Sequence, residues 1–385
     1  MGPWSGTRVV DLSGLAGAYG TRVWAALGAD VIKVEPPGGN PMRAYEPLAP
    51  GVDAPEAGLW WAYFAAGSRS VVLDPSAAAD EARLAALLSS ADVVIDDSPA
   101  ALQDRAGWGH SAVRAANPAT SWVAITPFGL TGPRRDWKTS DLVAWSSAGL
   151  TYTIGFPGQA PMAPAAPVQL AYHLTSLNAV LGAMFALRGR RRSGRGQLVD
   201  LSIQEVALSI APETGVPLFL DDRVPRPRAG NRRPITSPFG LFPCSDGYVA
   251  MLVLQPNHWN AMAGWIYDET GNEGVRDPVF ADIVVRNEAS DAIDMWTEEL
   301  TTKHTKLELF LEGQRRGIPL TPVNTVADLR ADPHLEQAGW WRDDTHPALG
   351  TYQVPGSPFY TSDDWWAWTR APLLGEHTDE VLAEC

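Results

Sequence analysis

Two residues of this sequence could carry acid–base chemistry. His173 stands near the start of a long apolar segment, and an imidazole titrates near neutral pH, so it could act as a general base. Asp141 opens an earlier apolar run, where a carboxylate could also accept a proton. Each has a structural alternative, because a histidine at a helix start often only packs and an acid in a first helical turn often only caps. Both residues are therefore candidates for a catalytic site.

Two basic residues could bind a phosphate-bearing ligand. Arg105 and Lys138 are suited to charge-assisted hydrogen bonds with phosphate, although both could be solvated surface charges. The chain as a whole is acidic, with a formal net charge of -14 over 385 residues. This balance argues against a nucleic-acid partner, because such proteins present basic surfaces to the phosphate backbone.

An α/β scaffold must position these side chains. Residues 8–12 and 29–35 are short apolar runs that predict strands, and residues 19–27 between them carry apolar side chains at helical spacing. Two strands joined by a helix lie parallel, and the crossover is nearly always right-handed. Ligands of such sheets bind beyond the carboxyl ends of the strands, which places a site at residues 13–18 and 36–43.

The glycines after the first strand exclude a dinucleotide fingerprint. Gly14, Gly17 and Gly20 are evenly spaced and do not form the GxGxxG pattern, so a nicotinamide site is not expected. The α/β rhythm continues through predicted strands at 70–74, 92–96 and 121–126 and helices at 79–89, 141–148 and 173–188. After a Pro- and Arg-rich linker at 221–238, an α+β pattern follows, with a strand at 248–254, a helix at 258–267 and a mostly helical stretch at 289–316.

Composition indicates a soluble, cytoplasmic protein. The two cysteines, Cys244 and Cys385, are too few for a disulfide framework or a zinc site. No signal peptide is recognisable, and no uninterrupted apolar run reaches the roughly 18 residues of a membrane span. We therefore expect neither a membrane nor a bound metal.

Four motifs give the chain a family resemblance. They are residues 27–39 (LGADVIKVEPPGG), 128–133 (FGLTGP), 194–197 (GRGQ) and, most strongly, 370–382 (RAPLLGEHTDEVL). Together they resemble the class III CoA-transferases, the family of formyl-CoA:oxalate CoA-transferase, carnitine CoA-transferase and α-methylacyl-CoA racemase. The resemblance runs the whole length of the chain.

The resemblance implies a particular architecture. Members have a Rossmann-like large domain built from both termini and a smaller inserted domain, and two chains form interlocked rings. For this chain it implies a large domain at 1–220 and 327–385, the linker at 221–238 and a small α+β domain at 239–326. An interlocked homodimer, or a heterodimer with a homologue, is expected.

The resemblance also implies a covalent mechanism, from which this chain departs. In the family an aspartate attacks the donor thioester, and CoA returns to form an aspartyl thioester before the acceptor acid completes the exchange. Counting back from Gly194 without gaps places Tyr172 at that position, and no acidic residue occurs between Asp141 and Asp200. A phenol with a pKa near ~10 is a poor substitute for the carboxylate.

Other implied site positions are partly altered. Ser140 stands where transferases have tyrosine and the racemase its catalytic histidine, so racemase activity is disfavoured. The family's glycine-rich flap corresponds to residues 231–239, which here contain Arg232-Arg233-Pro234, so access for the acceptor is expected to differ. The positions implied to line the CoA groove are Leu15, Ala16, Ser68, Asp97, Arg105 and Lys138.

Three functions remain open. The first is an active enzyme that moves CoA between carboxylic acids, with CoA or an acyl-CoA as substrate and no permanently bound cofactor. In it Tyr172, His173, Asp141 and Ser140 would form the altered catalytic site. The second is a non-catalytic subunit that pairs with an Asp-bearing homologue. The third is an acyl-CoA-binding protein.

Overall fold

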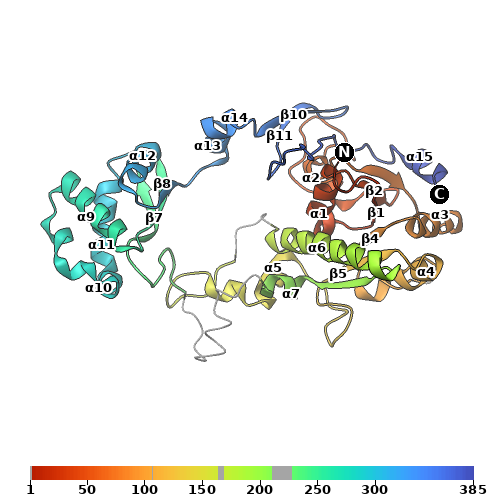
Figure 1. Ribbon diagram of the computed structural model, residues 1–385, viewed down its shortest axis with the longest axis horizontal. Coiled ribbons are helices and arrows are strands. Elements are labelled where there is room, and N and C mark those ends of the chain that lie inside the picture. Colours follow the sequence, from red (N-terminus) through yellow and green to blue (C-terminus); the bar gives the residue numbers. More distant parts are fainter. Residues whose placement is uncertain (1, 106, 164–168, 210–227) are drawn as a thin grey trace. The chain divides into compact units, whose positions relative to one another are not determined.

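The computed structural model describes residues 2–105, 107–163, 169–209 and 228–385 (Figure 1). It divides into two compact units. Unit 1 contains the described parts of residues 1–151, 164–224 and 337–385, and unit 2 contains those of 152–163 and 225–336. The first seven residues of the linker expected at 221–238 lie outside the described residues.

Unit 1 is built on a six-stranded parallel sheet with the order β3-β2-β1-β4-β5-β6. The strands are β1 (Arg8–Asp11), β2 (Asp30–Glu35), β3 (Arg69–Val72), β4 (Val93–Asp96), β5 (Ser121–Thr126) and β6 (Leu198–Ser202). Strands β4 and β5 are buried along their whole length, as expected for parallel strands covered on both faces. The first five strands confirm the predicted ones to within two residues.

Helices cover both faces of this sheet. Apolar side chains of α1 and α6 pack on one face and those of α3, α4 and α15 on the other, which gives a doubly wound α/β unit. The elements are α1 (Leu15–Ala26), α2 (Leu59–Phe64), α3 (Ala78–Ser89), α4 (His110–Ala116), α5 (Asp141–Ser147), α6 (Leu170–Ser193), α7 (Ile203–Ser209), α15 (Thr378–Ala383) and the hairpin β10 (Trp341–His346) and β11 (Gly350–Pro355). Short 3-10 helices span Pro41–Ala44, Ala100–Leu102 and Leu150–Thr153.

The C-terminal motif is anchored to the first half of the sheet. The backbone amide of Gly375 donates to Ser70 Oγ at 2.8 Å, and Trp61 Nε1 donates to the carbonyl of Pro372 at 2.9 Å. Arg43 donates to the same carbonyl and forms an ion pair with the buried Glu35. These contacts are why residues from both ends of the sequence share one unit (Figure 1).

The contact between α1 and α6 leaves no room for a side chain at Gly20. Its amide donates to Ser176 Oγ at 2.6 Å, and a Cβ there would lie 2.3 Å from the Ser176 carbonyl oxygen. Gly20→Ala should therefore force the helices apart and lower the free energy of unfolding by about 2 kcal/mol, the usual range for overpacking. Gly189→Ala on α6 is the control, because no atom lies within 4 Å of its added methyl group. It should stabilise by about 0.5–1 kcal/mol through helix propensity.

Urea unfolding of the two variants measures this difference. The expected result is a lower midpoint for Gly20→Ala and a slightly higher one for Gly189→Ala, with similar slopes. Equal midpoints would show that the helices tolerate a methyl group at their contact.

Unit 2 contains a three-stranded antiparallel sheet with the order β7-β8-β9. Its inner face, with Phe242, Val249 and Met251, packs with Trp259 and Met262 from the helical layer. The elements are β7 (Phe239–Cys244), β8 (Gly247–Leu252), β9 (Leu320–Pro322), α9 (Pro256–Thr270), α10 (Ile283–Glu288), α11 (Ser290–Thr301), α12 (Lys306–Arg316), α13 (Val326–Arg330) and α14 (Pro333–Gln337), with 3-10 helices at Glu273–Arg276 and Pro278–Ala281. The α+β pattern is observed, and the stretch predicted as mostly helical at 289–316 contains the two helices α11 and α12.

In the part of the chain that the structure describes, one helix is long and apolar enough to cross a membrane by length and composition. This is α6, and 44% of its apolar window is buried within unit 1. There it packs against α1 and the sheet, as the core helix of a soluble protein does.

Candidate active site

The candidate site lies at the carboxyl ends of β1 and β4. These neighbouring strands mark the point where the strand order reverses, which is where open α/β sheets bind ligands. The chain leaves β1 through Ser13 and Gly14 and enters α1 at Leu15, followed by the buried Ala16. Asp97 directly follows β4, and its Oδ2 accepts a hydrogen bond from the Gly14 amide at 2.9 Å. Residues from two distant parts of the sequence thus meet at the start of α1.

A buried ion pair supports the turn between β1 and α1. Asp11 and Lys33 form this pair, and their side chains are 0% and 1% exposed. Asp11 Oδ1 also accepts hydrogen bonds from the amide and hydroxyl of Ser13, at 2.7 and 2.6 Å. Asn40 Nδ2 donates to the Ser13 carbonyl at 3.1 Å. The turn that presents the start of α1 is therefore fixed from several sides.

The surroundings of Asp97 shift the pKa of its carboxyl group. Burial raises its pKa to about 7, and the negative charges of Asp96 and Asp11 act in the same direction. The Gly14 amide and the Lys33 ammonium oppose the rise but do not cancel it. Asp97 consequently changes charge near neutral pH.

Asp141 connects α5 to the start of α6. Ser140 is the N-cap of α5, where its side chain accepts from the Val143 amide, and Asp141 follows in the first turn. Asp141 Oδ1 accepts a hydrogen bond from the Ala171 amide at 2.9 Å, so it caps α6 from outside that helix. Burial raises the pKa of Asp141, while the amides of Ala171 and Tyr172 and the nearby His173 lower it.

Tyr172 lies in the first turn of α6, within electrostatic reach of two carboxylates. Burial raises its pKa to about 12, and the negative charges of Asp141 and Asp97 contribute in the same direction. The phenol is therefore neutral at physiological pH, when it can donate a hydrogen bond but offers almost no phenolate.

His173 is packed among aromatic rings. Its ring centroid lies 5.8 Å from that of Tyr19 and 5.3 Å from that of Phe64. Its Nδ1 atom is buried without a hydrogen-bond partner in the described residues. Burial lowers its pKa, and the charge of Asp141 partly offsets this effect. A neutral imidazole in an aromatic cluster fits the packing alternative at least as well as the catalytic one.

The remaining candidates lie in different surroundings. Arg105 donates to Asp96 Oδ2 at 3.3 Å, and its guanidinium lies 4.2 Å from the centre of the Trp108 ring, so it is held close to the end of β4. Lys138 is exposed, and no ion pair to it is found among the described residues.

Ser68 donates to the Ala65 carbonyl at 2.6 Å and is nearly buried. Its neighbour Gly67 lies against Ala25, near the end of α1. Ser68 is thus separated from Leu15 by about the length of α1, roughly 15–18 Å for twelve residues at 1.5 Å each.

Comparison with protein families shows to which family the chain belongs. The family model for CoA-transferase family III matches residues 4–378. The chain belongs to this family. It is 32% identical to the succinyl-CoA:(R)-benzylsuccinate CoA-transferase subunit BbsE of Thauera aromatica, covering 98% of this chain and 93% of that protein. It is 31% identical to the succinate–glutarate CoA-transferase of Agrobacterium fabrum, covering 99% and 95%.

A solved structure agrees with this membership. The CAIB/BAIF family protein from Brucella suis superposes with a TM-score of 0.87 at 27% identity, covering 100% of this chain and 99% of that one. The recognition of a class III CoA-transferase from the motifs is therefore confirmed. The predicted α/β class is confirmed with it, and the structure adds a sixth parallel strand, β6, to the five predicted.

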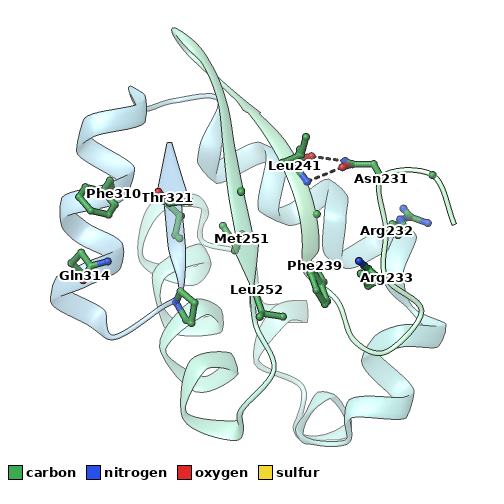
Figure 2. Close-up of a pocket in the computed structure, with 15 residues that line it drawn as sticks. Asn231, Arg232, Arg233, Phe239, Leu241, Met251, Leu252, Phe310, Gln314 and Thr321 are labelled. Atoms are coloured by element: carbon green, nitrogen blue, oxygen red, sulfur yellow. Dashed lines mark hydrogen bonds between the residues drawn. The ribbon is translucent and has the colours of Figure 1, made fainter. Parts of the chain in front are cut away.

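This CoA-transferase family member also contains a separate cavity in unit 2. It has a volume of about 630 Å³ and is lined by residues of β7, β8 and β9 and by Phe310 and Gln314 of α12 (Figure 2). Asn231 closes one side by exchanging two hydrogen bonds with the Leu241 backbone, at 2.6 and 2.8 Å. Arg232 forms ion pairs with Asp291 and Asp294, so it is not a free cation. Residues 231–233, which the family resemblance placed at the flap position, thus line this cavity.

Two features of the candidate site were not predicted from the sequence. The first is the Asp11–Lys33 ion pair, whose only signal was a charged residue inside each of two apolar runs. The second is the aromatic cluster of Tyr19, Phe64 and His173, which comes from three helices. Among the described residues, no cluster of histidine, cysteine or acidic side chains is suited to a metal ion.

Proposed function

We propose that the protein takes part in CoA transfer from an acyl-CoA donor of the succinyl-CoA type to a small carboxylic acid. The similarity to CoA-transferase family III over residues 4–378 carries this proposal. The names of the relatives support the donor, because the Thauera protein is a succinyl-CoA:(R)-benzylsuccinate CoA-transferase subunit and the Agrobacterium protein is a succinate–glutarate CoA-transferase. The acceptors of the relatives differ, so the acceptor of this chain is proposed only as a carboxylic acid.

The thioester end of CoA would lie in the crevice between β1 and β4. Leu15 and Ala16 start α1 there, and the amides of a helix start attract negative charge. Arg105 and the exposed Lys138 are proposed to contact the phosphates, with Ser68 and Asp97 as further lining positions. CoA is a substrate in this proposal and not a permanently bound cofactor.

The covalent step is proposed to occur on a partner chain. An aspartate route forms an anhydride with release of CoA thiolate, then a thioester with release of the donor acid, and Tyr172 cannot replace the carboxylate in that sequence. The Thauera relative is named as a subunit, and a Chloroflexus relative at 29% identity is the alpha subunit of a succinyl-CoA–L-malate CoA-transferase. These names support an enzyme of two different homologous chains.

The proposed domain and subunit arrangement also rests on the membership of the family. We propose a cytoplasmic, interlocked dimer, with residues 1–220 and 327–385 as the large domain and 239–326 as the small one. Either arrangement, a homodimer or a heterodimer, would place two α6 sites in one enzyme. Only the heterodimer would provide an Asp-bearing site beside this chain.

A second candidate is transfer by this chain alone. The contact of Asp141 with the first turn of α6 favours it, because a carboxylate remains beside Tyr172 and His173. In that case Asp141 or His173 would remove a proton in a direct or water-mediated reaction, with Ser140 at the edge of the site.

A transfer assay tests the proposed function. Succinyl-CoA is incubated with glutarate, L-malate or (R)-benzylsuccinate, and new acyl-CoA products are separated by chromatography. We expect transfer when an Asp-bearing homologue is supplied with this chain. CoA binding without any transfer in either mixture would assign the chain to acyl-CoA binding instead.

A further inference from the structure

Arg22 of α1 is a buried cation without an acidic partner. It is only 3% exposed, and its Nε and Nη2 atoms are buried without a hydrogen-bond acceptor among the described residues. Burial lowers its pKa, and the groups that oppose this effect are the phenols of Tyr63 and Tyr19, not a carboxylate. Arg43, which is 2% exposed, forms an ion pair with Glu35 instead. A buried charge such as Arg22 requires a compensating group.

Aromatic rings line the Arg22 guanidinium but give it no oxygen. Its Cζ atom lies 4.1 Å from the ring centre of Tyr63 on α2 and 4.4 Å from that of Trp368 in the C-terminal segment. Such cation–π contacts offset part of the cost of burying the charge, but they leave the N–H groups without an acceptor atom. The two atoms concerned, Nε and Nη2, form one edge of the planar group. This edge is a fork that fits the two oxygens of a carboxylate.

Two further unpaired donors lie around the same group. The ring centre of Trp366 is 5.9 Å from the Arg22 Cζ atom, so two indoles of the C-terminal segment adjoin the guanidinium. The Nε1 atoms of Trp366 and Trp368 are both buried, and neither has an acceptor in the part of the chain that the structure describes. An indole N–H can only donate, and buried donors in native proteins are nearly always paired. Three side chains thus gather donors and a positive charge without an acceptor.

We propose that Arg22, Trp366 and Trp368 form a binding site for a small carboxylate anion, which is held by the Nε–Nη2 edge of the guanidinium. The chemical class follows from this edge, because a carboxylate accepts two parallel hydrogen bonds from it. The size follows from the burial of Arg22, which restricts the ligand to the scale of formate or acetate. Arg22 lies about two turns along α1 from Leu15, and the inference does not depend on the proposed function.

The C-terminal segment covers this site. Residues 365–368 have no regular secondary structure, and the amide of Ala367 donates to the Ala26 carbonyl at the end of α1 at 2.7 Å. Because Trp366 and Trp368 adjoin Arg22, an anion bound there lies between the helix and this segment and holds the two together. Binding to the folded state alone stabilises a protein by mass action. The anion is therefore expected to raise the melting temperature.

Thermal unfolding in sodium acetate tests the site. Sodium chloride is replaced stepwise by sodium acetate at constant ionic strength, and acetamide supplies the shape of acetate without its charge. Arg22→Met keeps the length and the apolar contacts of the side chain and loses the fork. Arg276→Met in unit 2 is the matched control, because Arg276 is exposed and its guanidinium lies 4.5 Å from the ring centre of Tyr267.

Wild type and Arg276→Met are expected to gain about 2–4 °C in saturating acetate beyond any gain of Arg22→Met, and to gain nothing in acetamide. The difference between wild type and Arg22→Met should grow with acetate and then level off as one site fills. An equal gain in these two proteins would overturn the site, because acetate would then act through general exclusion from the protein surface. Either result leaves the proposed CoA transfer untouched.

A second variant and the wild type alone keep the test decisive if Arg22→Met does not fold. Arg22→Lys keeps the charge but has no fork, so it should lose most of the acetate gain. In wild type alone, a gain that saturates in acetate and is absent in acetamide supports the site. A gain that rises linearly without saturation, or equal melting temperatures in chloride and acetate, would overturn the assignment to a carboxylate.

Discussion

Wild-type protein incubated with succinyl-CoA and hydroxylamine is expected to carry no hydroxamate at residue 172, whereas Tyr172→Asp is expected to carry one. The reason is that a neutral phenol with a pKa near 12 cannot form the anhydride and thioester of the aspartate route. The introduced carboxylate would stand in the first turn of α6, beside Asp141 and within electrostatic reach of Asp97. Peptide mass spectrometry detects the adduct directly.

The rate should change with the adduct. Exchange of CoA between succinyl-CoA and free succinate should rise by roughly 100-fold or more in Tyr172→Asp, the order by which one positioned catalytic group accelerates a reaction. Tyr172→Phe is the matched control, because it removes the hydroxyl group and adds no carboxylate, and it should stay at the wild-type rate. A hydroxamate on Asp141 of wild type would contradict the account, because the nucleophile would then have moved within this chain.

Lys33→Ala is expected to destabilise the protein by about 3–5 kcal/mol, the usual cost of leaving one member of a buried ion pair without its partner. Lys33 and Asp11 are almost completely buried, and Asp11 also fixes the Ser13 turn that leads into α1. The uncompensated carboxylate would have to take up a proton or expose itself to water. Urea unfolding at neutral pH, read through the midpoint and slope, measures the loss.

Lys303→Ala is the control for this variant. Its ammonium group lies 4.0 Å from Glu299 at an exposed position, and such pairs contribute less than about 1 kcal/mol. If Lys33→Ala had the same urea midpoint as Lys303→Ala, the buried pair would not be what stabilises the β1–α1 turn.

The parallel sheet could be predicted because its strands are apolar on both faces. Residues 121–126 are the clearest case, since every side chain of β5 is buried. Strand β6 was not predicted, because it lies at the sheet edge and alternates between exposed and half-buried positions. The stretch at 289–316 was predicted only as mostly helical, and the capping box of Thr305 and Glu308 is the local signal for the start of its second helix.

The site could be predicted only as separate residues. Asp141, Tyr172 and His173 were named from the sequence, and the structure places them together at the start of α6. The contact between Gly14 and Asp97 could not be foreseen, because it depends on β1 and β4 being neighbours. Strand order is a property of the whole sheet, and no local pattern encodes it.

The most direct test of the central claim is CoA transfer by the purified chain with and without an Asp-bearing homologue. Each mixture is supplied with succinyl-CoA and an acceptor acid, and the acyl-enzyme is trapped with hydroxylamine in parallel. The account predicts transfer in the presence of the homologue, with the hydroxamate on the homologue and none on this chain. Full turnover by this chain alone, with the trapped adduct on one of its own carboxylates, would contradict it.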